Sequence, residues 1–94
     1  MNKEKVMLNK EQIEKTFTDF GCKRTITESG KICYSKNGIY FKFNYCKELN
    51  AYVLETSESV KDTLFEDSEV YGIRFSDENT LQKLKDDLIK YYGT

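Results

Sequence analysis

Large apolar and polar side chains alternate in the middle of the chain. Four large apolar residues occupy every second position there: Ile39, Phe41, Phe43 and Tyr45. A period of two places them on one face of a β-strand. The preceding Asn37-Gly38 tolerates the two positive φ angles of a type I′ hairpin turn. With a second turn at residues 47–50 and a further strand over 51–56, the pattern predicts a three-stranded antiparallel meander over residues 31–56.

Helical patterns flank this meander on both sides. Near the N-terminus, Asn9 and Gln12 have the spacing of a capping box, and Gly21 supplies a left-handed C-cap. Between them, apolar residues recur at spacings of four and three, which predicts a helix over residues 10–20. A second helix begins after a capping Ser76 and ends at Gly93. Its expected buried stripe consists of Leu81, Leu84, Leu88 and Tyr91 or Tyr92.

The remaining segments complete the expected fold. Residues 23–28 predict a strand with few apolar side chains, which favours a sheet edge. Ser57 is expected to cap a short helix, followed by a loop over residues 65–68 and a strand over 69–75 with Tyr71, Ile73 and Phe75 on one face. The predicted fold class is α+β. A single domain, residues 1–94, would contain an antiparallel four- to five-stranded sheet with the N- and C-terminal helices packed on one face.

The residue inventory limits the chemistry. The chain has no histidine, which excludes a His-dependent triad or a His-ligated zinc site. Glycine-rich phosphate loops are absent as well, so we expect no enzyme, no catalytic residue, no cofactor and no metal. Three cysteines without a secretory signal predict free thiols in a reducing cytoplasm. No apolar run approaches the ~20 residues of a membrane span.

Charge is unevenly distributed along the chain. Residues 1–47 carry ten Lys/Arg and five Asp/Glu, a net charge of +5, whereas residues 48–94 carry five and eleven, a net charge of −6. Most of the acidic excess lies within fifteen residues: Glu55, Glu58, Asp62, Glu66, Asp67 and Glu69. Such a segment can be a solvated face or a docking patch for a basic partner. A calcium loop is a weaker alternative, since the spacing matches no EF-hand.

Tyrosines form the second surface candidate. If Phe41 and Phe43 face the helices, Tyr40 lies on the opposite face of the sheet, near Tyr34 or Tyr52. Tyrosines there can pack structurally, serve a protein interface or stack on bases of a single strand, with nearby lysines on phosphate. The net charge of −1 and the lack of an RNP-like motif argue against nucleic acid.

Three segments of the second half carry a resemblance to a known family. They are Ala51–Ser59 (AYVLETSES), Phe65–Tyr71 (FEDSEVY) and Asp87–Tyr92 (DLIKYY). This order resembles small immunity proteins of bacterial polymorphic toxin systems, in particular the TriTu-like group. The resemblance implies a cytoplasmic protein that binds and neutralises a cognate toxin domain.

We therefore expect a non-enzymatic immunity protein with a toxin domain as partner, and neither nucleic acid nor membrane. The alternatives are a phage-type or nucleic-acid-mimicking inhibitor or adaptor, and a small single-strand nucleic-acid-binding domain. Within the expected toxin-binding surface, Glu66 and Asp67 are the leading candidates because they fall in an expected loop. The full expected partner-binding set is Glu55, Glu58, Asp62, Glu66, Asp67, Glu69, Tyr40 and Tyr52.

Overall fold

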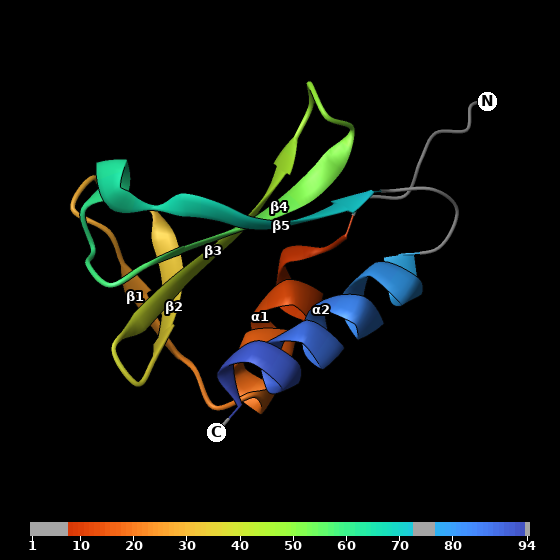
Figure 1. The fold of residues 1–94 in the computed structure, drawn as a ribbon, viewed down its shortest axis with the longest axis horizontal. Helices are drawn as coiled ribbons and strands as arrows, with labels where there is room; N and C mark the ends of the chain where they lie inside the picture. Colours follow the sequence, from red (N-terminus) through yellow and green to blue (C-terminus); the bar gives the residue numbers. More distant parts are fainter. Residues whose placement is uncertain (1–7, 73–76, 94) are drawn as a thin grey trace.

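The computed structural model describes residues 8–72 and 77–93 and has an α+β fold (Figure 1). A five-stranded antiparallel sheet is contacted by helices at both ends of the chain, as predicted. The elements in chain order are α1 (Lys10–Asp19), β1 (Lys23–Ile26), β2 (Ile32–Lys36), β3 (Ile39–Cys46), β4 (Ala51–Ser57), the 3-10 helix η1 (Asp62–Leu64), β5 (Glu66–Gly72) and α2 (Asp77–Tyr92).

Every strand of the sheet pairs with its neighbour in the chain, in the order β1-β2-β3-β4-β5. The predicted hairpin turn is confirmed: Asn37 and Gly38 have φ angles of 54° and 85° and join β2 to β3. The second turn is also present and ends at Asn50, with φ at 50°. Strand β1 lies at one edge, as its thin apolar content predicted, and β5 lies at the other.

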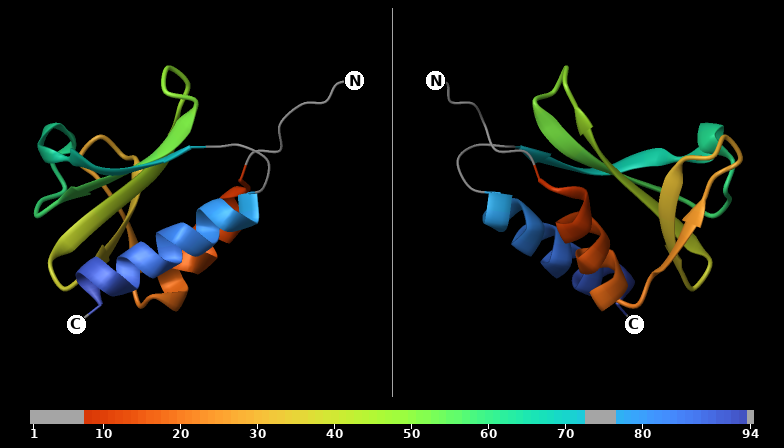
Figure 2. Two further views of the ribbon diagram at one scale, coloured as in Figure 1. Left: turned by 45° about the vertical axis from the view of Figure 1, so that its right-hand side comes forward. Right: turned by 180° about the vertical axis from the view of Figure 1, so that it is seen from behind.

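Both helices cover the same face of the sheet (Figure 2). Helix α1 begins with the predicted capping box between Asn9 and Gln12. Phe17 from α1 is fully buried and stacks on Tyr34 with ring centroids 4.7 Å apart. From α2, Leu84 and Leu88 are fully buried in the same core. The apolar stripes of both helices therefore close over the alternating residues of β3 and β4.

The segment between β4 and β5 differs from the prediction. Ser57 is the last residue of β4, not a helix cap, and the only helical turn here is η1. Residues 66–68 belong to β5, so the expected loop is wrong and Glu66 and Asp67 lie on a strand. Cross-strand pairing decides both differences, because β4 extends until Ser57 lies opposite Tyr40. The predictions for Ile73, Phe75 and Ser76 lie outside the described residues.

Candidate functional site

The acidic segment divides into an internal part and an external part. Glu55 and Asp62 form the internal part and flank Lys42, whose side chain is only 8% exposed. The Lys42 ammonium lies 3.5 Å from Asp62 Oδ1 and 4.0 Å from Glu55 Oε1. It also lies 4.3 Å from the centre of the buried Phe65 ring. These two carboxylates compensate a buried cation, which gives them a structural role.

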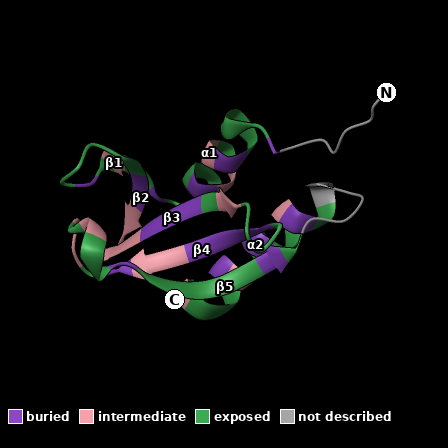
Figure 3. Cartoon of the chain, turned by 90° about the horizontal axis from the view of Figure 1, so that it is seen from above, coloured by how far each residue is buried: buried purple, intermediate pink, exposed green. Residues whose placement is uncertain are grey.

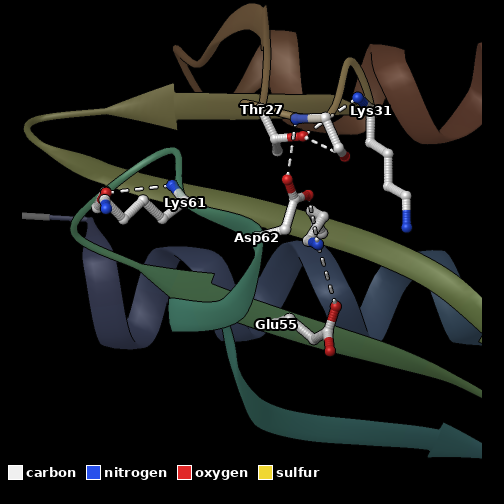
Figure 4. A network of polar contacts seen from close by, with 8 residues as sticks. Thr27, Lys31, Glu55, Lys61 and Asp62 are labelled. Atoms are coloured by element: carbon white, nitrogen blue, oxygen red, sulfur yellow. Dashed lines mark hydrogen bonds and ion pairs between the residues drawn. The ribbon is translucent and has the colours of Figure 1, made fainter.

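Asp62 fastens the β4–β5 connection (residues 58–65) across the second face of the sheet. Its Oδ2 accepts a hydrogen bond of 3.0 Å from the backbone N–H of Ser29, in the turn between β1 and β2. Nearby, the N–H of Glu28 donates to the carbonyl of Val60. Figure 4 shows Asp62 reaching from this connection toward Thr27. The connection therefore covers the face opposite the helices at this end of the sheet.

The ionisation of Asp62 reflects this position. Desolvation alone would raise its pKa, but hydrogen bonds from Thr27 and Ser29 together with the charge of Lys42 lower it to about 2. Hydrogen bonds and cations favour the charged form of a carboxyl group. Asp62 is thus an anion at neutral pH whose charge is already satisfied within the fold.

The external part consists of four exposed carboxylates, which we call the acidic edge: Glu58, Glu66, Asp67 and Glu69. Three of them lie on β5, whose exposed surface runs along one side of the sheet (Figure 3). Among the described residues, none of the four forms an ion pair. Within residues 8–72 and 77–93, strand β5 pairs only with β4, so its outer backbone groups are open to a further strand.

A β-bulge sets the direction of these side chains. Glu66 lies opposite Thr56 and Glu69 lies opposite Leu54, with a register shift between them. Thr56 and Leu54 are two residues apart and share the helix-covered face of β4. Glu66 and Glu69 therefore also share that face, although a spacing of three would separate them on a regular strand. Asp67 lies opposite Glu55 and belongs to the other face.

Two hollows adjoin β5 on this side. The first, which we call the Tyr91 hollow, has a volume of about 430 Å³ and is lined by Glu69, Asp87, Tyr91 and Tyr92, among others. The second, the Leu64 hollow, has a volume of about 370 Å³ and is lined by Glu58, Glu66, Leu64 and Tyr92, among others. Each hollow therefore combines two carboxylates with apolar or aromatic surface, and Tyr92 borders both.

Tyr92 lies between the two hollows and is held there by contacts with β5 and β3. The Tyr92 hydroxyl lies 3.1 Å from Ser68 Oγ, and its ring packs edge-on against Phe41 at 5.1 Å between centroids. Nearby, the Tyr71 hydroxyl donates a 2.8 Å hydrogen bond to Asp87 on α2. Burial first, and this carboxylate second, raise the pKa of Tyr71. Helix α2 is thus attached to β5 beside the acidic edge.

The predicted tyrosine surface is wrong in its main members. Tyr52 is 4% exposed and stacks on Phe43 at 5.0 Å, so it belongs to the core under the helices. Tyr34 is buried there as well, whereas Tyr40 is half-buried and lies opposite Ser57. The aromatic side chains beside the acidic edge are instead Tyr91 and Tyr92. The sequence predicted that Tyr91 or Tyr92 would join the buried helix stripe, and Tyr92 is the one that packs against the core.

The cysteine and acidic side chains do not form a metal site in the part of the chain that the structure describes. No group of three or more cysteine or acidic side chains could hold a metal ion there. Cys22 and Cys33 are buried free thiols, and burial raises the pKa of Cys22 to about 11. Cys46 is free and half-buried. None of the described helices combines the length and apolar character required to cross a membrane.

Comparison of the chain with protein-family models, with curated proteins and with solved structures gave no match.

Proposed function

We propose that this chain is a non-enzymatic immunity protein that binds and neutralises a basic toxin domain in the cytoplasm through its acidic edge. The observation that carries the proposal is the set of four exposed carboxylates on and beside an open edge strand: Glu58, Glu66, Asp67 and Glu69. They are concentrated on one border of the sheet, and no described cation compensates them. Such a border attracts a basic surface and steers its approach.

The internal pair Glu55 and Asp62 is not part of the proposed surface. Lys42 already compensates both carboxylates. Tyr52 is likewise omitted because it lies in the core. The proposed surface therefore keeps the external carboxylates and adds Tyr91, which is 62% exposed next to Glu69 and Asp87. Exposed tyrosine is favoured at protein interfaces.

Single-strand nucleic-acid binding on the sheet has weaker support. Such binding needs aromatic rings on an open sheet face with cations beside them. Here Tyr34 and Tyr52 are buried under the helices, and Lys42 is enclosed on the opposite face. The acidic edge would in addition repel phosphate.

The test is a binding titration with the cognate toxin domain. Glu66→Lys/Asp67→Lys reverses two charges on β5, and Glu11→Lys/Asp19→Lys reverses two exposed charges on α1 as a control. Because rim charges act mainly on association, we expect the β5 variant to associate about tenfold more slowly at low salt, with a smaller difference at high salt. An unchanged on-rate and affinity in a folded β5 variant would remove this strand from the interface.

A further inference from the structure

We propose that the partner adds an extended strand to the open edge of β5 and places two cationic side chains, two residues apart, over the Leu64 and Tyr91 hollows. This inference rests on the proposed function and specifies how the basic partner is recognised. It commits to one occupant: a basic segment of a protein in strand conformation.

The first argument is the backbone of β5. The strand has seven residues and pairs with β4 on one side, and no other strand in the described part of the chain pairs with its other side. An extended peptide can add to such an edge through main-chain hydrogen bonds, while alternate side chains provide specificity. The opposite edge strand, β1, has four residues and carries Lys23 and Arg24. Charge complementarity therefore favours β5 as the edge for a basic segment.

The second argument is the spacing of the carboxylates. The bulge places Glu66 and Glu69 on one face, two ladder positions apart. Two positions along a strand correspond to about 7 Å. Alternate side chains of an added strand have the same spacing and lie about 5 Å from their cross-strand neighbours. A segment with cations at positions i and i+2 therefore matches both carboxylates at once, and the intervening side chain faces the side of Asp67.

The third argument is the surroundings of each carboxylate. Beside Glu69, the Tyr91 hollow offers the exposed Tyr91 ring, which Lys90 approaches from one side at 5.3 Å. Its second carboxylate, Asp87, is 14% exposed and already pairs with Lys83, so Glu69 is the carboxylate that a partner cation meets here. Beside Glu66, the Leu64 hollow offers Glu58 and the apolar Leu64 side chain, which is 51% exposed. A long cationic side chain places its apolar stem on such surface and its charge on the carboxylates. An aromatic ring also attracts a guanidinium group.

Charged edge strands have a competing explanation. Carboxylates on an edge can serve only to keep identical sheets apart. Under that explanation, any neutralising cation would weaken the repulsion, and the position of the cations along a peptide would have no effect. Dependence on cation spacing and on peptide backbone N–H groups therefore separates the two explanations.

The experiment uses the full chain, labelled with ¹⁵N, and blocked synthetic hexapeptides. The probe TVRVRT has arginines at i and i+2, and the control TVRRVT has the same composition with its arginines on opposite faces. We expect the probe to bind about threefold more tightly, because the control loses one exposed charge pair, whose contribution to affinity is small. We also expect slower amide exchange in β5. Equal binding of both peptides, or unchanged exchange in β5 at saturation, would overturn the inference.

Two further variants test the details. Glu66→Gln/Glu69→Gln should remove the preference for TVRVRT, whereas Glu11→Gln/Asp19→Asn should retain it. Two N-methylated versions of TVRVRT, each methylated on one of the two alternate sets of residues, should differ sharply in affinity. The reason is that only one set of N–H groups faces β5 in an added strand. Equal binding of the two N-methylated peptides would overturn the inference.

The outcomes also separate this inference from the proposed function. Loss of toxin binding in Glu66→Lys/Asp67→Lys, with β5 amides exchanging as fast in the toxin complex as in the free protein, would support the function and overturn the strand-addition mode. Spacing-dependent peptide binding with unchanged toxin binding would support the strand-addition site and overturn the toxin as its occupant.

Discussion

Phe17 is the side chain that fastens α1 to the sheet, and its removal gives a quantitative test of the fold. Its ring is fully buried, and its centroid lies 4.7 Å from Tyr34, 5.8 Å from Phe41 and 6.3 Å from Phe43. Phe17→Ala therefore removes one ring from a four-ring cluster and leaves a cavity between helix and sheet. Such a change costs about 3–5 kcal/mol in the free energy of unfolding.

This cost is large relative to the whole protein. A domain of this size has a total stability of roughly 5–15 kcal/mol. Each kcal/mol lowers the melting temperature by about 4–8 °C in a domain of 60–100 residues, so we expect a decrease of roughly 15 °C or more. In the Phe17→Ala variant at low temperature, the acidic edge should keep its structure, because β5 is held by β4 and α2 and not by Phe17.

Urea unfolding followed by far-ultraviolet circular dichroism measures the change. Tyrosine fluorescence provides a second probe, since the chain contains seven tyrosines and no tryptophan. Tyr91→Ala is the matched control, because its ring is 62% exposed, and we expect a change within about 0.5 kcal/mol. A loss below about 1 kcal/mol for Phe17→Ala, or one equal to that of the control, would refute this account of the core.

Three further predictions follow from single positions. Because the pKa of Asp62 is lowered from 3.8 to about 2, the stability that its charge contributes is complete above pH 4 and is lost as the pH falls toward 2. Between about pH 4 and 2, the urea midpoint of Asp62→Asn should therefore fall less than that of the unmodified protein, and equal falls would contradict this. Gly38→Ala forces a side chain into φ 85° and should cost about 1–2 kcal/mol by urea unfolding; an unchanged stability would contradict the turn geometry. In timed alkylation with mass spectrometry, Cys46 should react before the buried Cys22 and Cys33, and simultaneous labelling would contradict their burial.

The elements that the sequence predicted correctly depend on local signals. The capping box at Asn9 and Gln12 fixes the start of α1, and the positive φ angles at Asn37 and Gly38 fix the hairpin. Both signals operate within a few residues, so tertiary contacts are not needed to recognise them. Alternation along β3 likewise predicted the burial of Phe41 and Phe43.

The elements that the sequence did not predict depend on distant contacts. A spacing of four between Val60 and Leu64 suggests a helix, but the backbone of Val60 and the side chain of Asp62 bind the turn between β1 and β2 instead. Ser29 and Asp62 are 33 residues apart, and no local sequence pattern predicts a contact between them.

The candidate site was predicted only in part, for the same reason. Exposure of Glu66 and Asp67 was predicted correctly, but they lie on an edge strand and not in a loop. The common face of Glu66 and Glu69 depends on a bulge that residue spacing alone does not reveal. The internal role of Asp62 depends on Lys42, which the alternation of β3 marks only as a polar position.

The division of the carboxylates into two groups has an evolutionary consequence. A change at Asp62 leaves the buried Lys42 with one carboxylate partner fewer, so it should spread only together with a compensating change at Lys42. The carboxylates of the acidic edge are not constrained in this way, because no described cation pairs with them. Its charges are free to drift or to reverse as a partner changes, without loss of the fold. Among homologous chains, correlated substitution is therefore expected around Lys42, and rapid diversification is expected along β5.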